Sequence, residues 1–175
     1  MQAEGLRVLN IAEIKIPDVR ITSQWDAEVL EHFKASVKAL GVIAPIIVVH
    51  DADCYYLVDG LHRLQEAQAQ GQREIKAYVF KGSLAQVHLL NLQLNHMRGK
   101  TPPTQMARVV RELQEKHGLQ PWEIAQRTGI SKDYIQKLLD IARCHPLVLA
   151  FNSLLRDQLW SGLSGSAARW LSFLS

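Results

Sequence analysis

The sequence has 175 residues, of which 47% are hydrophobic and 21% charged, a composition typical of a folded globular protein rather than of a disordered chain. No apolar run approaches the ~20 residues that cross a bilayer, and residues 1–10 contain no apolar signal segment, so we expect a cytoplasmic protein without membrane contact. The net charge of +3 comes from residues 101–175, where nine Lys and Arg face six Asp and Glu, and this surplus is compatible with nucleic-acid binding.

The first part of the chain predicts helices mixed with strands. From residue 22 to 41, apolar residues recur every three or four positions, which predicts a helix that is capped by Thr22 or Ser23 and ended by Gly41. Two β-branched runs at residues 43–50 and 54–60 then predict a pair of strands. A second amphipathic pattern predicts a helix at residues 61–70, and an alternating run predicts a further strand at residues 75–80.

After these strands the sequence predicts helices only. Residues 83–97 have one apolar face, and a double proline beyond them predicts the start of another helix, which continues to Gly118. We therefore predict an α+β fold, with a small α/β domain at residues 1–98 and an all-helical domain at residues 99–175.

Residues 119–143 have the arrangement of a helix-turn-helix motif. A short helix with Ile124 and Ala125 leads to a turn at Gly129, and Ser131 can cap the helix that follows. A plain helical hairpin has the same periodicity, but small, turn and capping residues at this spacing together favour the DNA-binding motif. The second helix of such a motif meets bases and phosphates near its start. The predicted DNA contacts are Ser131, Lys132, Asp133, Tyr134, Gln136 and Lys137.

A possible phosphate site lies at the turn DGLHR. Asp59 and Gly60 close a strand, and the next residue begins a helix, whose unpaired backbone N–H groups carry the positive end of the helix dipole. Gly60 lets an anion approach the main chain, and His62 and Arg63 would add positive charge. Asp59 would suit an Mg²⁺ ion that bridges phosphates, or it could simply be the helix N-cap.

The stretch SVKALGVIAPIIVVHDADCYYLVDGLHRLQEAQAQGQREIKAYV, residues 36–79, resembles the N-terminal domain of the ParB/sulfiredoxin superfamily. In ParB partition proteins a Gly-Glu-Arg-Arg stretch opens a helix and binds the triphosphate of CTP, and residues 60–63 stand at its four positions. The stretch NHMRGKTPPTQMA, residues 95–107, resembles a second ParB segment, with Leu94 in place of its glutamate. The helix-turn-helix follows at the distance that ParB proteins show, and GLSGSAARWL, residues 162–171, resembles a later helical segment.

This resemblance implies a DNA-binding protein of plasmid or chromosome partition, or of transcriptional regulation. Its N-terminal domain would bind a nucleoside triphosphate, CTP or ATP with Mg²⁺, as a switch, and would hydrolyse it weakly if at all. The implied partners are double-stranded DNA, the nucleotide, a partition ATPase and further copies of the chain, with a location at the nucleoid. The implied nucleotide-binding residues are Ser36, Gly41, Pro45, Gly60, Leu61, His62, Arg63, Asn95 and Arg98.

Two alternatives remain open for the DGLHR turn. The turn is also similar to the Asp-Gly-His-His-Arg stretch of free-serine kinases in the same superfamily. This similarity would make Asp59 a catalytic residue on Mg²⁺ in a phosphotransferase, for which Glu28 or Glu31 on the preceding helix is a candidate base or, more simply, a solvated helix charge. In the other alternative Asp59 caps the helix, and Arg63 pairs with Glu66 or Asp59 as an ordinary surface ion pair.

Overall fold

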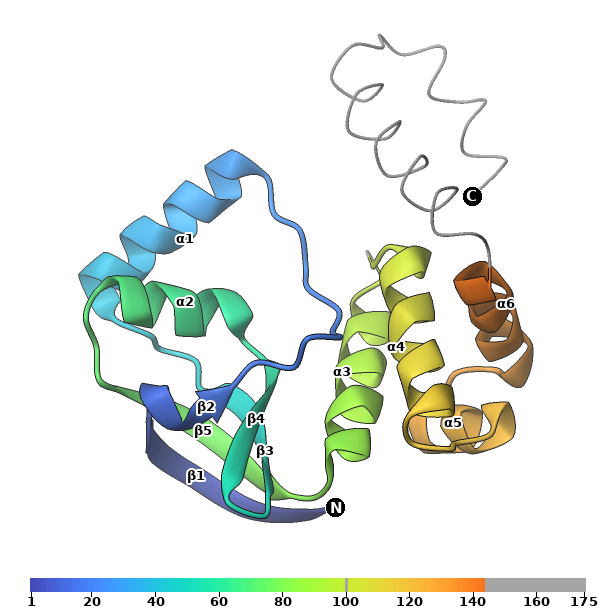
Figure 1. The fold of residues 1–175 in the computed structure, drawn as a ribbon. Coiled ribbons are helices and arrows are strands. Elements are labelled where there is room, and N and C mark those ends of the chain that lie inside the picture. The colour runs from blue at the N-terminus through green and yellow to red at the C-terminus, as the bar shows by residue number, and fades with distance from the viewer. Residues whose placement is uncertain (100, 144–175) are drawn as a thin grey trace, which may run out of the picture.

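A computed structural model describes residues 1–99 and 101–143 of the protein. The fold contains a five-stranded mixed sheet in its N-terminal part, and only helices follow the last strand in the described residues. The strands are β1 (Gln2–Asn10), β2 (Ile14–Lys15), β3 (Ile46–Asp51), β4 (Cys54–Asp59) and β5 (Glu74–Lys81), with a short 3-10 helix at Ile11–Glu13. The α-helices are α1 (Ala27–Leu40), α2 (Leu61–Ala69), α3 (Leu84–Arg98), α4 (Pro103–Glu115), α5 (Pro121–Thr128) and α6 (Lys132–Arg143). Helix α2 packs on one face of the sheet with α1 beside it, and α3 packs on the other face (Figure 1). The predicted α+β fold is confirmed.

The strand order in the sheet is β1-β5-β3-β4-β2. The predicted strand pair is an antiparallel hairpin of β3 and β4, and β5 runs parallel to β3. The sequence patterns predict no helix or strand before residue 22, yet β1 pairs antiparallel with β5 at the edge of the sheet. Only Leu9 of β1 is buried, so its sequence lacks the alternation of buried and exposed residues that identifies a strand.

Helix α1 begins later than the sequence predicts. Its N-cap is Asp26 rather than Thr22 or Ser23. Thr22 stays outside the helix, where its backbone N–H donates to Oε1 of Gln105 on α4, at 2.9 Å. Gly41 ends the helix as predicted, with a φ of 72° that favours glycine.

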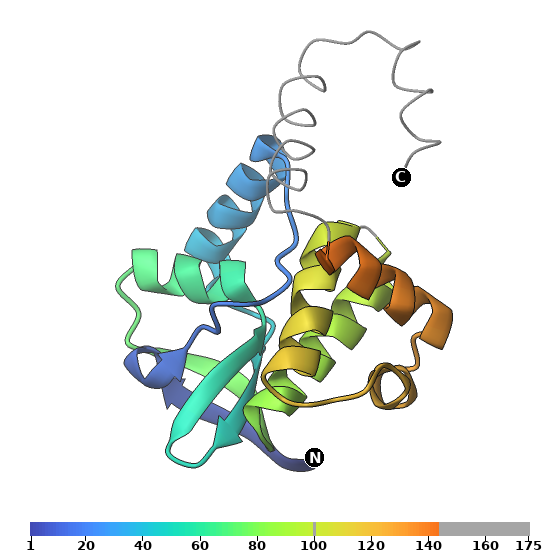
Figure 2. The same ribbon diagram turned by 45° about the vertical axis from the view of Figure 1, so that its right-hand side comes forward.

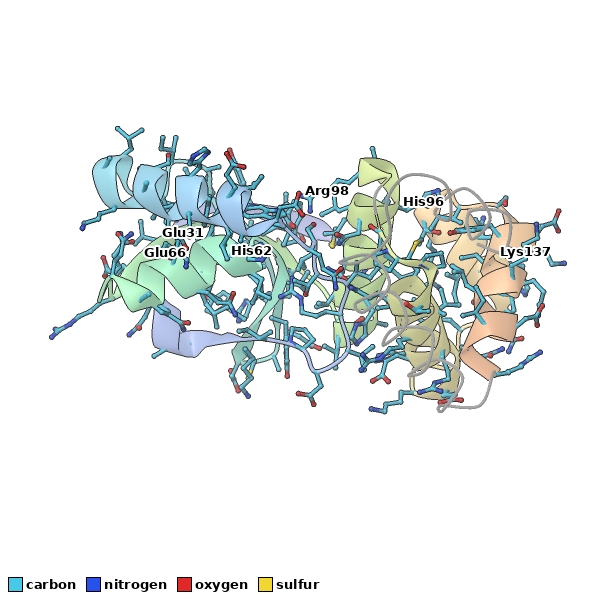
Figure 3. All side chains as sticks on the ribbon, turned by 90° about the horizontal axis from the view of Figure 1, so that it is seen from above. Glu31, His62, Glu66, His96, Arg98 and Lys137 are labelled. Carbon is cyan, nitrogen blue, oxygen red and sulfur yellow. The ribbon has the colours of Figure 1, made fainter. Side chains whose placement is uncertain are left out.

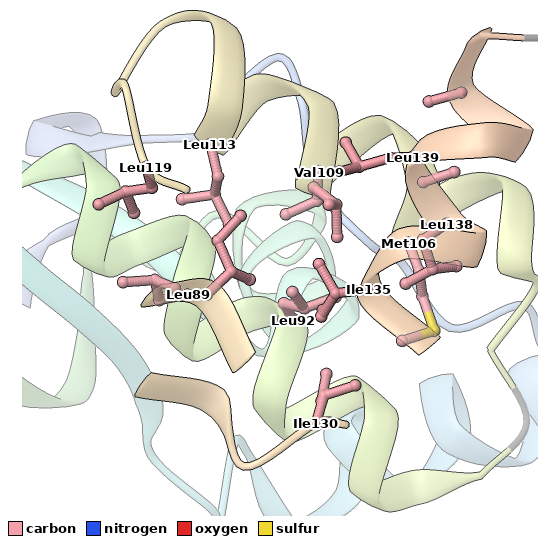
Figure 4. Packing of buried hydrophobic residues seen from close by; sticks show 14 of the residues in the cluster. Leu89, Leu92, Met106, Val109, Leu113, Leu119, Ile130, Ile135, Leu138 and Leu139 are labelled. Atoms are coloured by element: carbon pink, nitrogen blue, oxygen red, sulfur yellow. The ribbon is translucent and has the colours of Figure 1, made fainter. Parts of the chain in front are cut away.

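Helix α3 is shared by two hydrophobic cores. Val87 packs against the sheet, whereas Leu89 and Leu92 belong to a larger core with α4, α5 and α6 (Figure 4). Ile21, from the segment between β2 and α1, also lies in this helical core and is 1% exposed. The domain boundary predicted at residue 99 therefore falls at the end of a helix that both halves of the molecule use.

Helices α5 and α6 have the predicted helix-turn-helix arrangement. Gly129 ends α5 with a φ of 73°, and Oγ of Ser131 accepts the N–H of Tyr134 at 3.3 Å, which caps α6. The later ParB-like segment at residues 162–171 lies outside the described residues. None of the helices in the described ranges is long and apolar enough to span a bilayer. Ala125 is partly buried against the core of this motif, and the fully buried residues of the motif include Ile124, Ile130, Ile135, Leu138 and Leu139.

A buried histidine on α3 makes the stability of the fold depend on pH. His88 is 2% exposed, and its ring centroid lies 5.5 Å from that of His117. Burial lowers the pKa of His88 to about 4, with His117 and Lys116 acting in the same direction and Glu112 opposing them. The unfolded chain takes up a proton near pH 6.5, whereas the folded chain resists protonation until the pH is far lower. The free energy of unfolding should therefore fall by about 2 kcal/mol between pH 7 and pH 5.

Urea unfolding at these two pH values tests the prediction. The loss should largely disappear in His88→Phe, because the variant has no imidazole to protonate at this position. His32→Gln, a change at an exposed histidine of α1, should keep the full loss. An equal loss in His88→Phe and in the unchanged protein would show that other groups cause the pH dependence.

Candidate functional site

A pocket of about 340 Å³ opens where the end of β4, the start of α2, the end of α3 and the segment between β2 and α1 meet. This volume lies within the range of small-molecule sites. Figure 2 shows the segment after β2 running towards α3 and α4 and returning to α1, so that it passes beside the start of α2. The lining residues are Arg20, Ile21, Thr22, Ser23, Trp25, Phe33, Asp59, Gly60, Leu61, His62, Arg63, Asn95 and Arg98.

The turn into α2 requires glycine at position 60. The backbone of Gly60 has a φ of 97°, in the left-handed region that other residues adopt only with strain. A Cβ atom there would lie 2.7 Å from Cγ2 of Ile46 and 3.1 Å from the guanidinium carbon of Arg63. A side chain at position 60 would therefore displace Ile46 or Arg63, in addition to straining the backbone.

Asp59 binds two arginines and does not cap α2. Arg98 donates to both carboxylate oxygens of Asp59, at 2.8 and 2.9 Å, and Arg63 donates to one of them at 2.9 Å. Arg63 also donates to the carbonyl oxygens of Ala44 and Pro45, which holds its guanidinium in place. The side chain of Asp59 is 12% exposed. The alternative in which Arg63 pairs with Asp59 is thus present, but as part of a partly buried network of two arginines and one acid instead of a simple surface pair.

The charges of the pocket favour an anion. Burial alone would raise the pKa of the Asp59 carboxyl, but the hydrogen bonds and charge of Arg98, together with the charge of Arg63, hold it below its usual value. Asp59 is therefore ionised at neutral pH and cancels one of the three guanidinium charges of Arg20, Arg63 and Arg98. Burial and the charge of Arg20 lower the pKa of His62, so its imidazole is neutral at pH 7. The pocket keeps a surplus of two positive charges.

The residues of the pocket do not fit a magnesium ion held by Asp59. Both oxygens of this carboxylate accept hydrogen bonds from guanidinium groups, and no other carboxylate lines the pocket. Mg²⁺ needs oxygen ligands that face it freely. Among residues 1–99 and 101–143, no group of three or more His, Cys, Asp and Glu could hold a metal ion. The prediction of magnesium on Asp59 therefore gains no support from the arrangement of the residues around it.

Glu31, a base in the kinase alternative, lies away from this pocket. It lines a separate groove between α1 and α2 with Glu66, and it pairs with Lys34 at 2.8 Å. Figure 3 shows Glu31 and Glu66 together, on the side of His62 that is farther from Arg98. Glu28 is exposed on α1 and does not line the pocket either. The structure thus brings neither acid of α1 to Asp59.

An aromatic surface adjoins the cations of the pocket. The ring of Trp25 stacks on the imidazole of His62, with centroids 4.3 Å apart and an angle of 26° between the planes. Phe33 supports Trp25 from the side at 5.0 Å. Trp25 is 39% exposed, so part of the indole faces solvent at the edge of the pocket. Such a ring offers a flat apolar contact to a planar ligand group.

Most of the predicted nucleotide-binding residues meet in the pocket. Pro45 lies behind it and holds Arg63, whereas Ser36 is exposed on α1 and Gly41 follows that helix, and neither lines the pocket. Arg20 and Trp25 also line the pocket, although no sequence pattern predicts a role for them, because both lie outside the motif-like stretches. Those predicted residues that line the pocket are Gly60, Leu61, His62, Arg63, Asn95 and Arg98.

The predicted DNA contacts cluster at the exposed start of α6, with one difference. Tyr134 is half-buried, its ring centroid lies 5.6 Å from that of His96 on α3, and its hydroxyl donates to the sulfur of Met106 on α4. Tyr134 therefore packs α6 against the helices beneath it. Figure 3 shows Lys137 on the opposite side of the molecule from His62. The exposed members of the predicted set are Ser131, Lys132, Asp133, Gln136 and Lys137.

Comparisons with known proteins agree with this arrangement. The model of the ParB N-terminal domain family matches residues 1–96. The chain is 30% identical over 135 residues to the chromosome-partitioning protein ParB of Myxococcus xanthus, covering 77% of this chain and 46% of that protein. It is 31% identical over 137 residues to a probable chromosome-partitioning protein ParB of Neisseria meningitidis, covering 78% and 48%. The chain thus spans about half the length of the curated relatives it matches.

A solved structure shows the same fold. The C-terminally truncated ParB of Caulobacter crescentus, complexed to the centromeric parS site, has a TM-score of 0.51 with this chain at 21% sequence identity. The match covers 83% of this chain and 76% of that one, so the likeness includes both the sheet and the helices that follow it.

Proposed function

Because the chain belongs to the ParB N-terminal domain family, we propose that it is a DNA-binding partition protein whose N-terminal pocket binds a nucleoside triphosphate. The observation that carries the proposal is the position of α3. This helix supplies Asn95 and Arg98 to the cationic pocket, and its opposite side packs against the helix-turn-helix. A nucleotide at Arg98 and DNA at α6 would therefore act on helices that touch each other. If both ligands bind one arrangement of these helices more tightly than another, each ligand changes the affinity of the protein for the other.

The pocket supplies the groups that a nucleotide requires. Arginine side chains and the start of α2 suit the phosphates, and the exposed part of Trp25 suits a base. The base could be cytosine or adenine, since the ring stacks on either. We include in the proposal a partition ATPase and a second copy of the chain as partners, and a place at the nucleoid, because these accompany partition of DNA in the family.

DNA binding is tested by measuring affinity for duplex DNA over a range of salt concentrations. Each phosphate contact that a lysine makes contributes about 0.9 to the slope of log affinity against log salt. Lys132→Gln with Lys137→Gln should therefore weaken binding and reduce this slope by up to about 2. Lys38→Gln with Lys81→Gln removes two exposed lysines from the N-terminal half and should change little.

Two outcomes would contradict the proposal. The first is affinity that does not respond to salt, because phosphate contacts release counterions. The second is an equal loss in both double variants, because this would assign the effect to total charge instead of to α6. Repeating the titration with CTP present then shows whether the pocket and α6 are coupled.

A further inference from the structure

Strand β1 has a long edge without a neighbouring strand. It stands at the end of the strand order β1-β5-β3-β4-β2, and Figure 1 shows it at the margin of the sheet. Among the described residues, β5 is the one element that β1 contacts extensively. The outer edge of β1 therefore presents backbone N–H and C=O groups with which a further strand can pair. No proline in Gln2–Asn10 prevents such pairing.

Apolar side chains accompany this edge on one face of the sheet. Leu6, Val8 and Tyr78 are 55%, 58% and 48% exposed. Leu6 pairs with Tyr78 in the register of β1 and β5, and Val8 follows Leu6 on the same face because side chains alternate along a strand. Phe80, two residues after Tyr78, packs beneath α3, so this is the face that α3 covers elsewhere. Helix α3 lies over β3 and β4, which leaves the corner formed by β1 and β5 uncovered by any described helix.

We propose that β1 pairs antiparallel with β1 of a second copy of the chain, about a two-fold axis at Leu6, so that the two sheets join along this edge. A two-fold axis of this kind brings the same surface of both copies together. Leu6 then lies opposite Leu6 of the second copy. An apolar row runs across the joined sheet from Tyr78 of one chain to Tyr78 of the other, and such cross-strand pairs stabilise a sheet.

The other face of β1 supplies opposite charges to the same pairing. Glu4 lies at a bulge in β1, and its side chain turns to the face of the sheet that α2 covers, where its Oε1 is 3.7 Å from Nδ1 of His50. Arg7 lies beside it, with Nη2 at 3.2 Å from Oε2 of Glu4. The side chain of Arg7 is 47% exposed, so its guanidinium can also reach across the edge.

These charges favour one register of the pairing. With Leu6 at the axis, Arg7 comes opposite Gly5 of the second copy and beside Glu4 of that copy, and the same contact occurs twice. A Cβ atom at Gly5 would meet no atom within 4 Å, so the space through which Arg7 reaches Glu4 is open. Placing the axis at Arg7 instead would set the two Arg7 side chains opposite each other, and like charges directly opposite destabilise a sheet.

The first test is the molar mass of the full chain by sedimentation equilibrium over a range of concentrations, without nucleotide or DNA. The unchanged protein should show an equilibrium of monomer and dimer. Leu6→Lys sets two ammonium groups opposite each other at the axis, so the dissociation constant should rise by about tenfold or more. Val29→Lys, at a residue of α1 that is 51% exposed, is the matched control and should dimerise as the unchanged protein does.

A mixing experiment separates contacts between copies from contacts within one chain. Arg7→Glu alone and Glu4→Lys alone each make both charge contacts between the copies repulsive, so each variant should dimerise about tenfold more weakly. An equimolar mixture of the two variants should dimerise nearly as well as the unchanged protein, because each mixed dimer has two attractive contacts. The pair of Glu4 and Arg7 within each chain stays broken in this mixture, so its recovery can come only from contacts between the copies.

The inference fails in three cases. The chain could remain a monomer at every concentration, which would leave the edge of β1 to a different protein or to solvent. Leu6→Lys could dimerise as well as Val29→Lys, which would place the contact elsewhere on the molecule. The mixture of Arg7→Glu and Glu4→Lys could stay as weak as either variant, which would make the pair important only within one chain. None of these results bears on the proposed binding of DNA and nucleotide, which is measured separately.

Discussion

Asp59→Asn should destabilise the protein and, at the same time, strengthen its binding of phosphate. The carboxylate is the counterion of Arg63 and Arg98, and Arg20 lies in the same pocket. Without it, three guanidinium groups face one another with no negative charge. Removing one partner of a buried ion pair costs several kcal/mol, but Arg98 is 47% exposed and partly solvated, so we expect a loss of about 2 kcal/mol.

Phosphate should reverse this loss, because the arginines released by Asp59→Asn become free to bind it. Thermal melting with increasing phosphate should therefore raise the melting temperature more in Asp59→Asn than in the unchanged protein. Asp53→Asn, a change in the exposed turn between β3 and β4, is the control and should follow the unchanged protein. The affinity for CTP measured by calorimetry should be kept or increased.

The same variant separates binding from catalysis. If Asp59 held Mg²⁺ for phosphoryl transfer, Asp59→Asn would lose nucleotide turnover and magnesium-dependent affinity. Under our interpretation, Asp59 is an internal counterion that competes with phosphate for Arg63 and Arg98. A magnesium-dependent loss of CTP affinity in the variant would therefore support the phosphotransferase alternative.

Asn91→Ala should cost about 3–5 kcal/mol of the free energy of unfolding, since each buried polar group left without a partner costs about 1–3 kcal/mol. Asn91 is 2% exposed. Its side chain binds the N–H and carbonyl of Ile21 and donates to the carbonyl oxygen of Val58 at the end of β4, at 2.9 Å. One amide thus joins the segment before α1 (residues 19–23), the sheet and α3. Its truncation leaves three main-chain groups unpaired.

Chemical denaturation of Asn91→Ala measures this cost, with Gln93→Ala on the same helix as the control. Gln93 is half-buried and makes no comparable bonds within the described part of the chain, so its change should cost less than about 1 kcal/mol. Under conditions in which Asn91→Ala is still folded, its CTP affinity should also fall, because residues 19–23, which line part of the pocket, are no longer fixed. A loss below about 1 kcal/mol for Asn91→Ala would show that the burial of the Ile21 side chain is enough to hold residues 19–23 in place.

Local patterns predicted the parts of the fold that depend on local energetics. The hairpin of β3 and β4, the glycines that end α1 and α5, and the Ser131 cap of α6 all follow from propensity and turn chemistry. Local patterns did not predict strand β1, because its place in the sheet comes from pairing with β5 while most of its side chains remain exposed. The start of α1 was misplaced for a similar reason, since a contact with Gln105 holds Thr22 outside the helix.

By itself, the sequence determined the fold class, the helix-turn-helix and the glycine turn with His62 and Arg63, because each is encoded in neighbouring residues. Which charged side chains pair with one another is decided by the tertiary structure. Arg98, 39 positions away, binds Asp59, and this contact makes the acid a counterion where the sequence also allowed a metal ligand or a helix cap. Only the folded chain brings Arg20 to the pocket, since residues 19–23 are placed by Asn91 and by the burial of Ile21 in the helical core. Spacing along the chain cannot reveal such contacts, because their energies depend on distances and burial in three dimensions.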